Sequence, residues 1–108
     1  MKLLTQAIIK KIPPLYSTDS TPDAKIVCKF FAPWSSWTWY VTEGQLEEDG
    51  DWLFFGLVVD GHEKELGYFI MSELESVSGP GGLKIERDLH FGNHRLLRDF
   101  TASNKKER

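Results

Sequence analysis

The pattern of hydrophobic and polar positions predicts a helix near the start of the chain. Leu4, Ile8 and Ile12 recur at helical spacing, whereas the lysines at positions 10 and 11 lie off that stripe. The proline pair at 13–14 ends the pattern, because proline lacks a backbone N–H and restricts the residue before it. We therefore expect an amphipathic helix over residues 3–12.

Four stretches with the composition of β-strands follow, at residues 26–31, 37–42, 52–60 and 66–71. The second stretch, WTWYVT, alternates strictly, so Trp37 and Trp39 lie on one face and Tyr40 lies on the other. The third, WLFFGLVVD, is nearly all apolar, as in a strand covered on both faces, and Gly56 within it indicates a bulge or a close backbone approach. Short connections favour an antiparallel meander.

The last third of the chain is less regular. Ser72 and Glu75 have the spacing of a capping box, which predicts a short helix. The glycine-rich residues 79–82 form a turn, and residues 83–91 form either a fifth, edge strand or an extended segment. Asn93 is placed to cap a last helix.

These elements predict one α+β domain over residues 1–100. It contains an antiparallel sheet of about four to five strands in a meander, with an N-terminal helix and one or two short helices. A flexible basic tail over residues 101–108 follows.

The composition limits the class of protein. Of 108 residues, 41% are hydrophobic and 27% charged, which is typical of a globular protein, and no apolar run approaches the roughly 20 residues of a membrane span. The single cysteine, Cys28, excludes an internal disulfide and is expected to be a buried, inert thiol. With no signal-peptide pattern, we expect a cytoplasmic protein, and we expect neither a cofactor nor a metal ion.

Charge is distributed unevenly along the chain. The segment 43–75 holds ten acids and one base, Lys64, so it carries −9, whereas the remaining residues carry +6 and the chain −3. Such asymmetry marks either an interaction face or well-solvated turns. Aromatic residues are also concentrated, with nine of fourteen between Phe30 and Phe55. They either fill the core or leave some rings exposed as anchors for a partner.

We favour a non-enzymatic binding protein that docks a protein partner through an acidic, aromatic-rich face. The partner is expected to include a nucleic-acid-processing protein, because an acidic face fits a basic nucleic-acid groove. The residues of this face are expected to be Trp34, Trp37, Tyr40, Glu43, Glu47, Glu48, Asp49 and Asp51.

Two other functions remain open. In the first, basic residues of the two chain ends bind nucleic acid directly, provided that the ends are neighbours in the fold. These residues are Lys10, Lys11, Arg95, Arg98, Lys105 and Lys106. In the second, Glu86, Asp88 and His90 form the site of a metal-dependent hydrolase, with His94 as a further candidate ligand. The alternative to this site is a charged edge strand with surface histidines.

Several segments resemble one known family over roughly residues 3–91. They are PPLYST at 13–18, KFF at 29–31, WTWY at 37–40, FFG at 54–56, ELGYF at 65–69, ELE at 73–75 and IERDL at 85–89. These segments are similar to the bacterial domain-of-unknown-function 2958 family, whose members are small single-domain proteins commonly carried on plasmids and integrative elements. The resemblance implies an accessory protein of a mobile element. It supplies no reaction and no catalytic residues.

Overall fold

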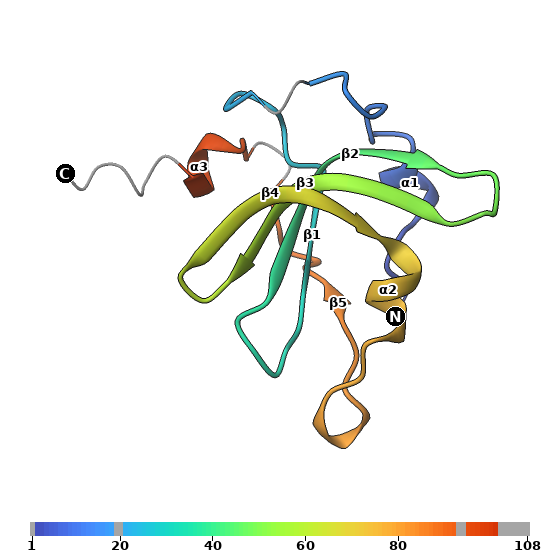
Figure 1. Ribbon diagram of the computed structural model, residues 1–108, viewed down its shortest axis with the longest axis vertical. Helices are drawn as coiled ribbons and strands as arrows, with labels where there is room; N and C mark the ends of the chain where they lie inside the picture. The colour runs from blue at the N-terminus through green and yellow to red at the C-terminus, as the bar shows by residue number, and fades with distance from the viewer. Residues whose placement is uncertain (1, 19–20, 93–94, 102–108) are drawn as a thin grey trace.

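Across residues 2–18, 21–92 and 95–101, which the structure describes, the computed structural model is built on one antiparallel sheet (Figure 1). Its strands are β1 (Cys28–Phe31), β2 (Thr38–Leu46), β3 (Trp52–Asp60), β4 (Glu63–Ile70) and β5 (Glu86–Arg87), in the spatial order β4-β3-β2-β1-β5. Strands β1 to β4 follow one another as neighbours, so the α+β class and the meander are confirmed, and β5 is the predicted edge strand.

The described helices are short: α1 (Gln6–Ile9), α2 (Met71–Ser76) and α3 (Arg98–Thr101), with a 3-10 turn at Pro80–Gly82. The predicted helix over residues 3–12 is reduced to α1. Its first turn starts at the N-cap Thr5, whose Oγ1 accepts the Ile8 N–H at 3.3 Å, because Leu3 and Leu4 are buried in the core ahead of it. Asn93 and residues 102–108 of the predicted tail lie outside the described residues.

The predicted capping box at Ser72 is wrong. Helix α2 begins at Met71, with Ile70 at the N-cap position two residues before Ser72, and the Ile70 side chain makes no capping hydrogen bond. The Ser72 N–H and hydroxyl instead donate to the carboxylate of Asp51, which comes from the turn between β2 and β3. A carboxylate from a distant segment therefore takes the place of the local cap.

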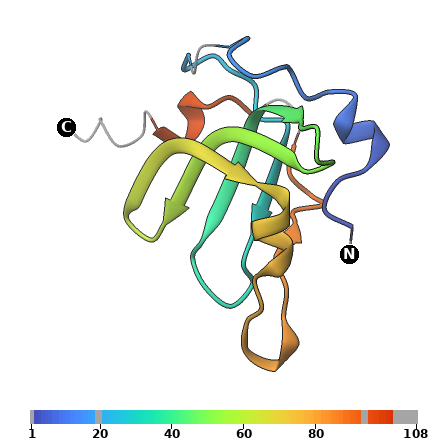
Figure 2. The same ribbon diagram turned by 45° about the vertical axis from the view of Figure 1, so that its right-hand side comes forward.

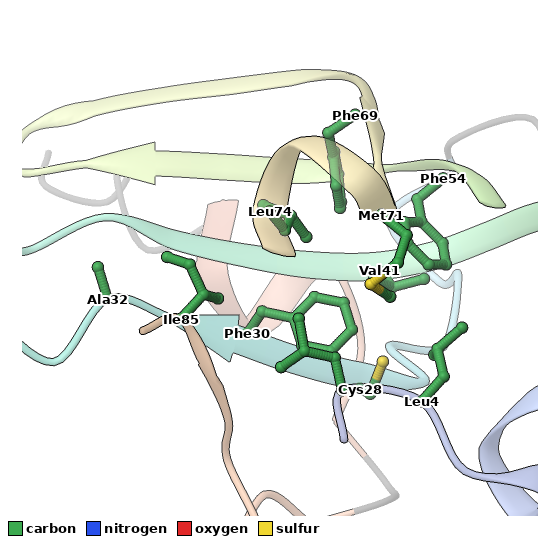
Figure 3. Packing of buried hydrophobic residues seen from close by; sticks show 11 residues of the cluster. Leu4, Cys28, Phe30, Ala32, Val41, Phe54, Phe69, Met71, Leu74 and Ile85 are labelled. Atoms are coloured by element: carbon green, nitrogen blue, oxygen red, sulfur yellow. The ribbon is translucent and has the colours of Figure 1, made fainter. Parts of the chain in front are cut away.

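Hydrophobic side chains cover both faces of the sheet. On one face, α2 and the N-terminal segment pack on Phe30, Val41 and Phe54, and we call this cluster the first core. Figure 3 shows Met71, Val41 and Phe54 gathered beside Phe30. On the other face, Tyr40 and Leu57 pack with residues that include Leu97, and Phe100 of α3 packs against this cluster. The apolar sequence of β3 follows from this double coverage, because its alternate side chains enter different cores.

A bulge at Thr42 interrupts the pairing of β2 with β3. Val41 pairs with Gly56 and Glu43 pairs with Phe55, so two steps along β2 match one step along β3. The Thr42 hydroxyl donates to the Phe55 carbonyl at 3.1 Å. A Cβ at Gly56 would lie 1.8 Å from the Tyr40 carbonyl oxygen, so the predicted bulge or close backbone approach at this glycine is confirmed.

The thiol of Cys28 is buried in the first core, as predicted. Burial raises its pKa to about 12, against a smaller opposing influence of the Arg87 charge. The thiol is therefore protonated at neutral pH and is a poor nucleophile. No helix in the described part of the chain is long and apolar enough to cross a membrane.

Candidate functional site

An apolar pocket of about 340 Å³ opens between the β1–β2 turn and the hairpin of residues 77–85. These two segments lie side by side in both ribbon views (Figures 1 and 2). The lining of the pocket consists of Ala32, Trp34, Ser35, Trp37, Trp39, Val77 and Ile85, and we call this site the tryptophan pocket. Ala32 and Ile85 also belong to the first core, as Figure 3 shows. The floor of the pocket is therefore continuous with that core.

Local hydrogen bonds fix the β1–β2 turn that presents the indoles. The Ala32 N–H donates to the Trp37 carbonyl at 3.0 Å, and the Ser35 N–H donates to the Ala32 carbonyl at 3.1 Å. The Ser35 hydroxyl in turn accepts the Trp37 N–H at 3.2 Å. Hydrogen bonds within the turn itself therefore define its shape.

Trp34 packs on the backbone of the neighbouring hairpin at Gly79. A Cβ atom at that position would lie 2.3 Å from the indole, which leaves no room for any other residue without displacing the ring. The Gly79 N–H donates to the Leu83 carbonyl at 2.8 Å and closes the hairpin. The glycine-rich segment is thus a turn, as predicted, and it also seats one wall of the pocket.

Trp37 is the most exposed of the three indoles, with 42% of its surface accessible. Its ring stacks on that of Trp39, with centroids 5.8 Å apart and planes inclined by 22°. The predicted exposure of rings in this region therefore holds for Trp37. Trp39 was omitted from the predicted site, although the alternation of β2 already placed it beside Trp37.

Tyr40 is not part of this surface, which corrects the predicted site. It is only 8% exposed and lies on the other face of β2, where its ring stacks on Phe100 at 4.3 Å. Burial raises the pKa of its hydroxyl, with a smaller opposing influence from Arg95.

Glu43 is likewise buried, at 3% exposure, and cannot contact a partner. Its carboxylate accepts the N–H of Tyr16 at 2.7 Å and that of Thr18 at 2.9 Å, and it also accepts the Thr18 hydroxyl. The bulge at Thr42 explains its position, since one extra residue moves every later side chain of β2 to the opposite face. Glu43 therefore anchors residues 16–18 on the second face instead of joining the indoles.

The remaining predicted acids lie in the β2–β3 turn, at the far end of β2 from the tryptophan pocket (Figure 1). They are Glu47, Glu48, Asp49 and Asp51. A strand of nine residues separates the two ends by about 30 Å. The acidic turn and the indoles are therefore two separate surfaces at opposite ends of β2. The prediction of a single acidic, aromatic-rich face is wrong for these four acids.

Three other acids share the face of the indoles. Trp39 pairs with Val58, and Val58 pairs with Glu65, so the three side chains lie in one row on one face. Asp60 and Glu63 pair with each other two residues beyond Val58 and Glu65. Their side chains therefore lie on the same face, at the end of the sheet where the indoles lie. Sequence reasoning missed these acids because only the strand register reveals which face they occupy.

Asp51 supports α2 through its bonds to Ser72. The Ser72 hydroxyl, followed by the N–H groups of Ser72 and Trp52, holds the pKa of Asp51 below its ordinary value of 3.8. A carboxylate with a lowered pKa stabilises the fold at pH values above its ordinary pKa. This stabilisation is lost as the pH falls through the lowered pKa.

We therefore expect Asp51→Ala to lower the Tm at pH 7 and to have a smaller effect as the pH falls below 3.8. Thermal unfolding followed by circular dichroism between pH 2.5 and 7 measures the difference. Glu48→Ala, an exposed change in the same turn, is the control. A difference in Tm that is constant over this range would contradict the role assigned to the Asp51 charge.

The basic residues proposed for nucleic acid are not brought together. Lys10 and Lys11 follow α1, whereas Arg95 and Arg98 lie next to and within α3, and the two helices stand on opposite sides of the molecule in both views (Figures 1 and 2). Arg98 pairs with Asp23, and the Arg95 Nε lies 3.5 Å from Asp99. The condition that the two chain ends are neighbours in the fold is therefore not met for these four residues, while Lys105 and Lys106 lie outside the described residues.

The carboxylates proposed for a hydrolase have other partners. Asp88 lies 3.5 Å from the Lys29 ammonium and accepts the His90 N–H at 2.9 Å. Glu86 belongs to the short edge strand β5. Over the described ranges no three His, Cys, Asp or Glu side chains form a set of metal ligands, so Glu86, Asp88 and His90 are not one; His94 lies outside those ranges.

The comparisons with known proteins reach the family level. A family model described as "Protein of unknown function (DUF2958)" matches residues 3–107, which is nearly the whole chain. No curated protein and no solved structure matches the sequence. The match extends past residue 91, where the resemblance between short segments ended.

Proposed function

The chain belongs to the DUF2958 family, proteins of unknown function, and we propose that it is a non-enzymatic binding protein that docks a protein partner through the tryptophan pocket. The observation that supports this proposal is the exposed Trp37 at the mouth of an apolar pocket. Tryptophan is one of the residues enriched among the energetic anchors of protein interfaces, and concave apolar sites are common binding sites.

The internal contacts that hold the walls of the pocket in place favour binding as well. The β1–β2 turn is held by its own hydrogen bonds, and Trp34 is seated against Gly79. A preformed site loses little conformational entropy when a partner docks, so more of the contact energy is available for affinity. We further propose a cytoplasmic setting on a bacterial mobile element, with a nucleic-acid-processing protein as the partner. That part is supported by the family resemblance and the acidic character of residues 43–75.

The proposal is tested by placing a photo-crosslinking residue, p-benzoylphenylalanine, at position 37 of the full chain in bacterial cells. Irradiation is expected to give a discrete covalent adduct with one protein, identified by mass spectrometry. The matched control carries the same residue at Leu46, which is 58% exposed at the opposite end of β2. Equal adducts at both positions, or no adduct at position 37, would refute docking through the pocket.

The purified partner then allows a measurement of affinity. Trp37→Ala is expected to weaken Kd by roughly 30-fold, about 2 kcal/mol, as for a central interface tryptophan. Leu46→Ala is expected to change Kd by less than about twofold. Circular dichroism checks that both variants remain folded, which we expect because both side chains are exposed. An unchanged Kd for Trp37→Ala would remove the pocket from the interface.

A further inference from the structure

The tryptophan pocket lies beside carboxylates, and this combination specifies what it binds. Resting on the proposed function, we infer that the pocket receives an arginine side chain of the partner, with the guanidinium stacked on an indole and facing the acids Asp60, Glu63 and Glu65. We call these three residues the acidic rim. They lie beyond the lining of the pocket, across Val58 from Trp39.

The position of the acidic rim follows from the pairing of three strands. Glu65 occupies the row of Trp39 and Val58. The pairing of Thr38 with Val59 continues beyond β2, since Ser36 Oγ lies 3.7 Å from the position of a Cβ on Gly61. Asp60 therefore stands opposite Trp37, and side chains that face each other in this way lie on the same side of the sheet.

The acidic rim is exposed, and no ion pair joins it to any residue of the described chain. Lys64, which lies between Glu63 and Glu65 in sequence, points to the other face and donates to the Phe100 carbonyl at 2.8 Å. The basic residue next to the lining, Lys84, donates to Ser78 Oγ at 3.0 Å. The negative charge of the rim is thus available to a cationic partner.

The indoles supply the second part of the recognition. A guanidinium is planar, weakly hydrated and attracted to the face of an aromatic ring, most strongly to tryptophan. Trp37 offers an exposed ring that Trp39 holds by stacking. The aliphatic part of an arginine side chain also fits an apolar wall such as Val77 and Ile85.

The same chemistry occurs within this protein on the other face of the sheet. The Arg95 guanidinium lies 4.7 Å from the centroid of the Phe100 ring and 6.0 Å from that of Phe91. The Asp99 carboxylate approaches its Nε at 3.5 Å. An arginine thus lies between aromatic rings and a carboxylate elsewhere in this chain. The tryptophan pocket offers the rings, the acidic rim offers the carboxylates beyond its lining, and no arginine is among the lining residues that the structure describes.

The test uses two small probes and the full-length ¹⁵N-labelled protein. Nα-acetyl-arginine amide and Nα-acetyl-norleucine amide share a similar length, and only the first carries a cation. Nuclear magnetic resonance follows the indole N–H signals of the four tryptophans, assigned with single Trp→Phe variants. We expect the arginine probe to shift the signals of Trp34, Trp37 and Trp39 with a millimolar Kd and to leave Trp52 unchanged.

Electrostatic contributions are separated by salt and by paired variants. Raising NaCl from 20 mM to 500 mM is expected to weaken binding of the arginine probe about threefold or more, because salt screens the interaction between surface charges. The double variant Glu63→Gln, Glu65→Gln is expected to weaken it by a similar factor. The double variant Glu47→Gln, Glu48→Gln removes the same charge at the far end of β2 and is expected to have no effect.

Each outcome decides the inference. Binding of norleucine amide that equals or exceeds that of arginine amide overturns it and leaves apolar docking in place. If neither probe shifts the indole signals at 50 mM while position 37 gives a discrete crosslink, the inference is overturned and apolar docking again remains in place. Binding of the arginine probe without any crosslink at position 37 supports the specificity of the pocket and refutes the proposed function.

Discussion

Gly56→Ala is expected to lower the free energy of unfolding by about 3 kcal/mol or more, at the upper end of the range for overpacking. A Cβ at this position would lie 1.8 Å from the Tyr40 carbonyl oxygen and 3.2 Å from the Val41 Cα. These are backbone atoms in the centre of the sheet, so no side chain can rotate away to relieve the clash. The bulge at Thr42 must then be rebuilt, together with the position of every residue that follows in β2.

Urea unfolding at pH 7 measures this effect, and the chain provides its own control. Gly67 pairs with Gly56 across β3 and β4, and a Cβ there would meet no atom within 4 Å. Gly67→Ala is expected to be neutral or slightly stabilising, because alanine has fewer unfolded conformations to lose. Equal stability losses in the two variants would show that the close approach of the backbones at Gly56 is not what constrains this position.

Glu43→Ala is expected to cost about 2–4 kcal/mol, since the variant removes three hydrogen bonds to a buried carboxylate and hydrogen bonds to charged groups are strong. The variant removes the acceptor of the Tyr16 and Thr18 N–H groups and of the Thr18 hydroxyl. Tyr16 is held with a φ of 69°, a conformation that residues other than glycine rarely adopt. Without the carboxylate, the backbone of residues 16–18 has less reason to keep this conformation.

Two measurements separate a local loss from a general one. Urea unfolding gives the change in stability, for which Glu48→Ala, an exposed neighbour on the same hairpin, is the reference and is expected to change it by less than about 0.5 kcal/mol. Hydrogen exchange of the Tyr16 and Thr18 amides is expected to accelerate more in Glu43→Ala than exchange of the amides of β3. Uniform acceleration across both segments would contradict the anchoring role of Glu43.

Much of the fold could be predicted because its signals are local. Residues 52–60 form β3 as their apolar run indicated, and strict alternation placed Trp37 and Trp39 on one face. Helix starts were less predictable, because tertiary contacts replaced local ones. The N-terminal helix shrank where Leu3 and Leu4 entered the core, and Asp51 took over the role of a cap at Ser72.

The site was less predictable, because a bulge and the strand register together decide which acids share the face of the indoles. Alternation from Trp39 through Val41 would place Glu43 on the indole face, but the extra residue at Thr42 sends it to the other face. Glu65 enters the site only through the register of β4 on β3, which no pattern within β4 reveals. The contact of Trp34 with Gly79 joins positions 45 residues apart and left no local signal.

That contact between Trp34 and Gly79 also couples occupancy of the pocket to the thermodynamics of the whole chain. The walls come from segments that are far apart in sequence, so the unfolded chain cannot assemble them and only the native state can bind there. At a ligand concentration of 100 times Kd, such linkage adds about 2.7 kcal/mol to stability. For a chain of this size that corresponds to roughly 10 °C in the melting transition. A thermal-shift screen of candidate proteins and peptides can therefore find the partner without any assay of activity.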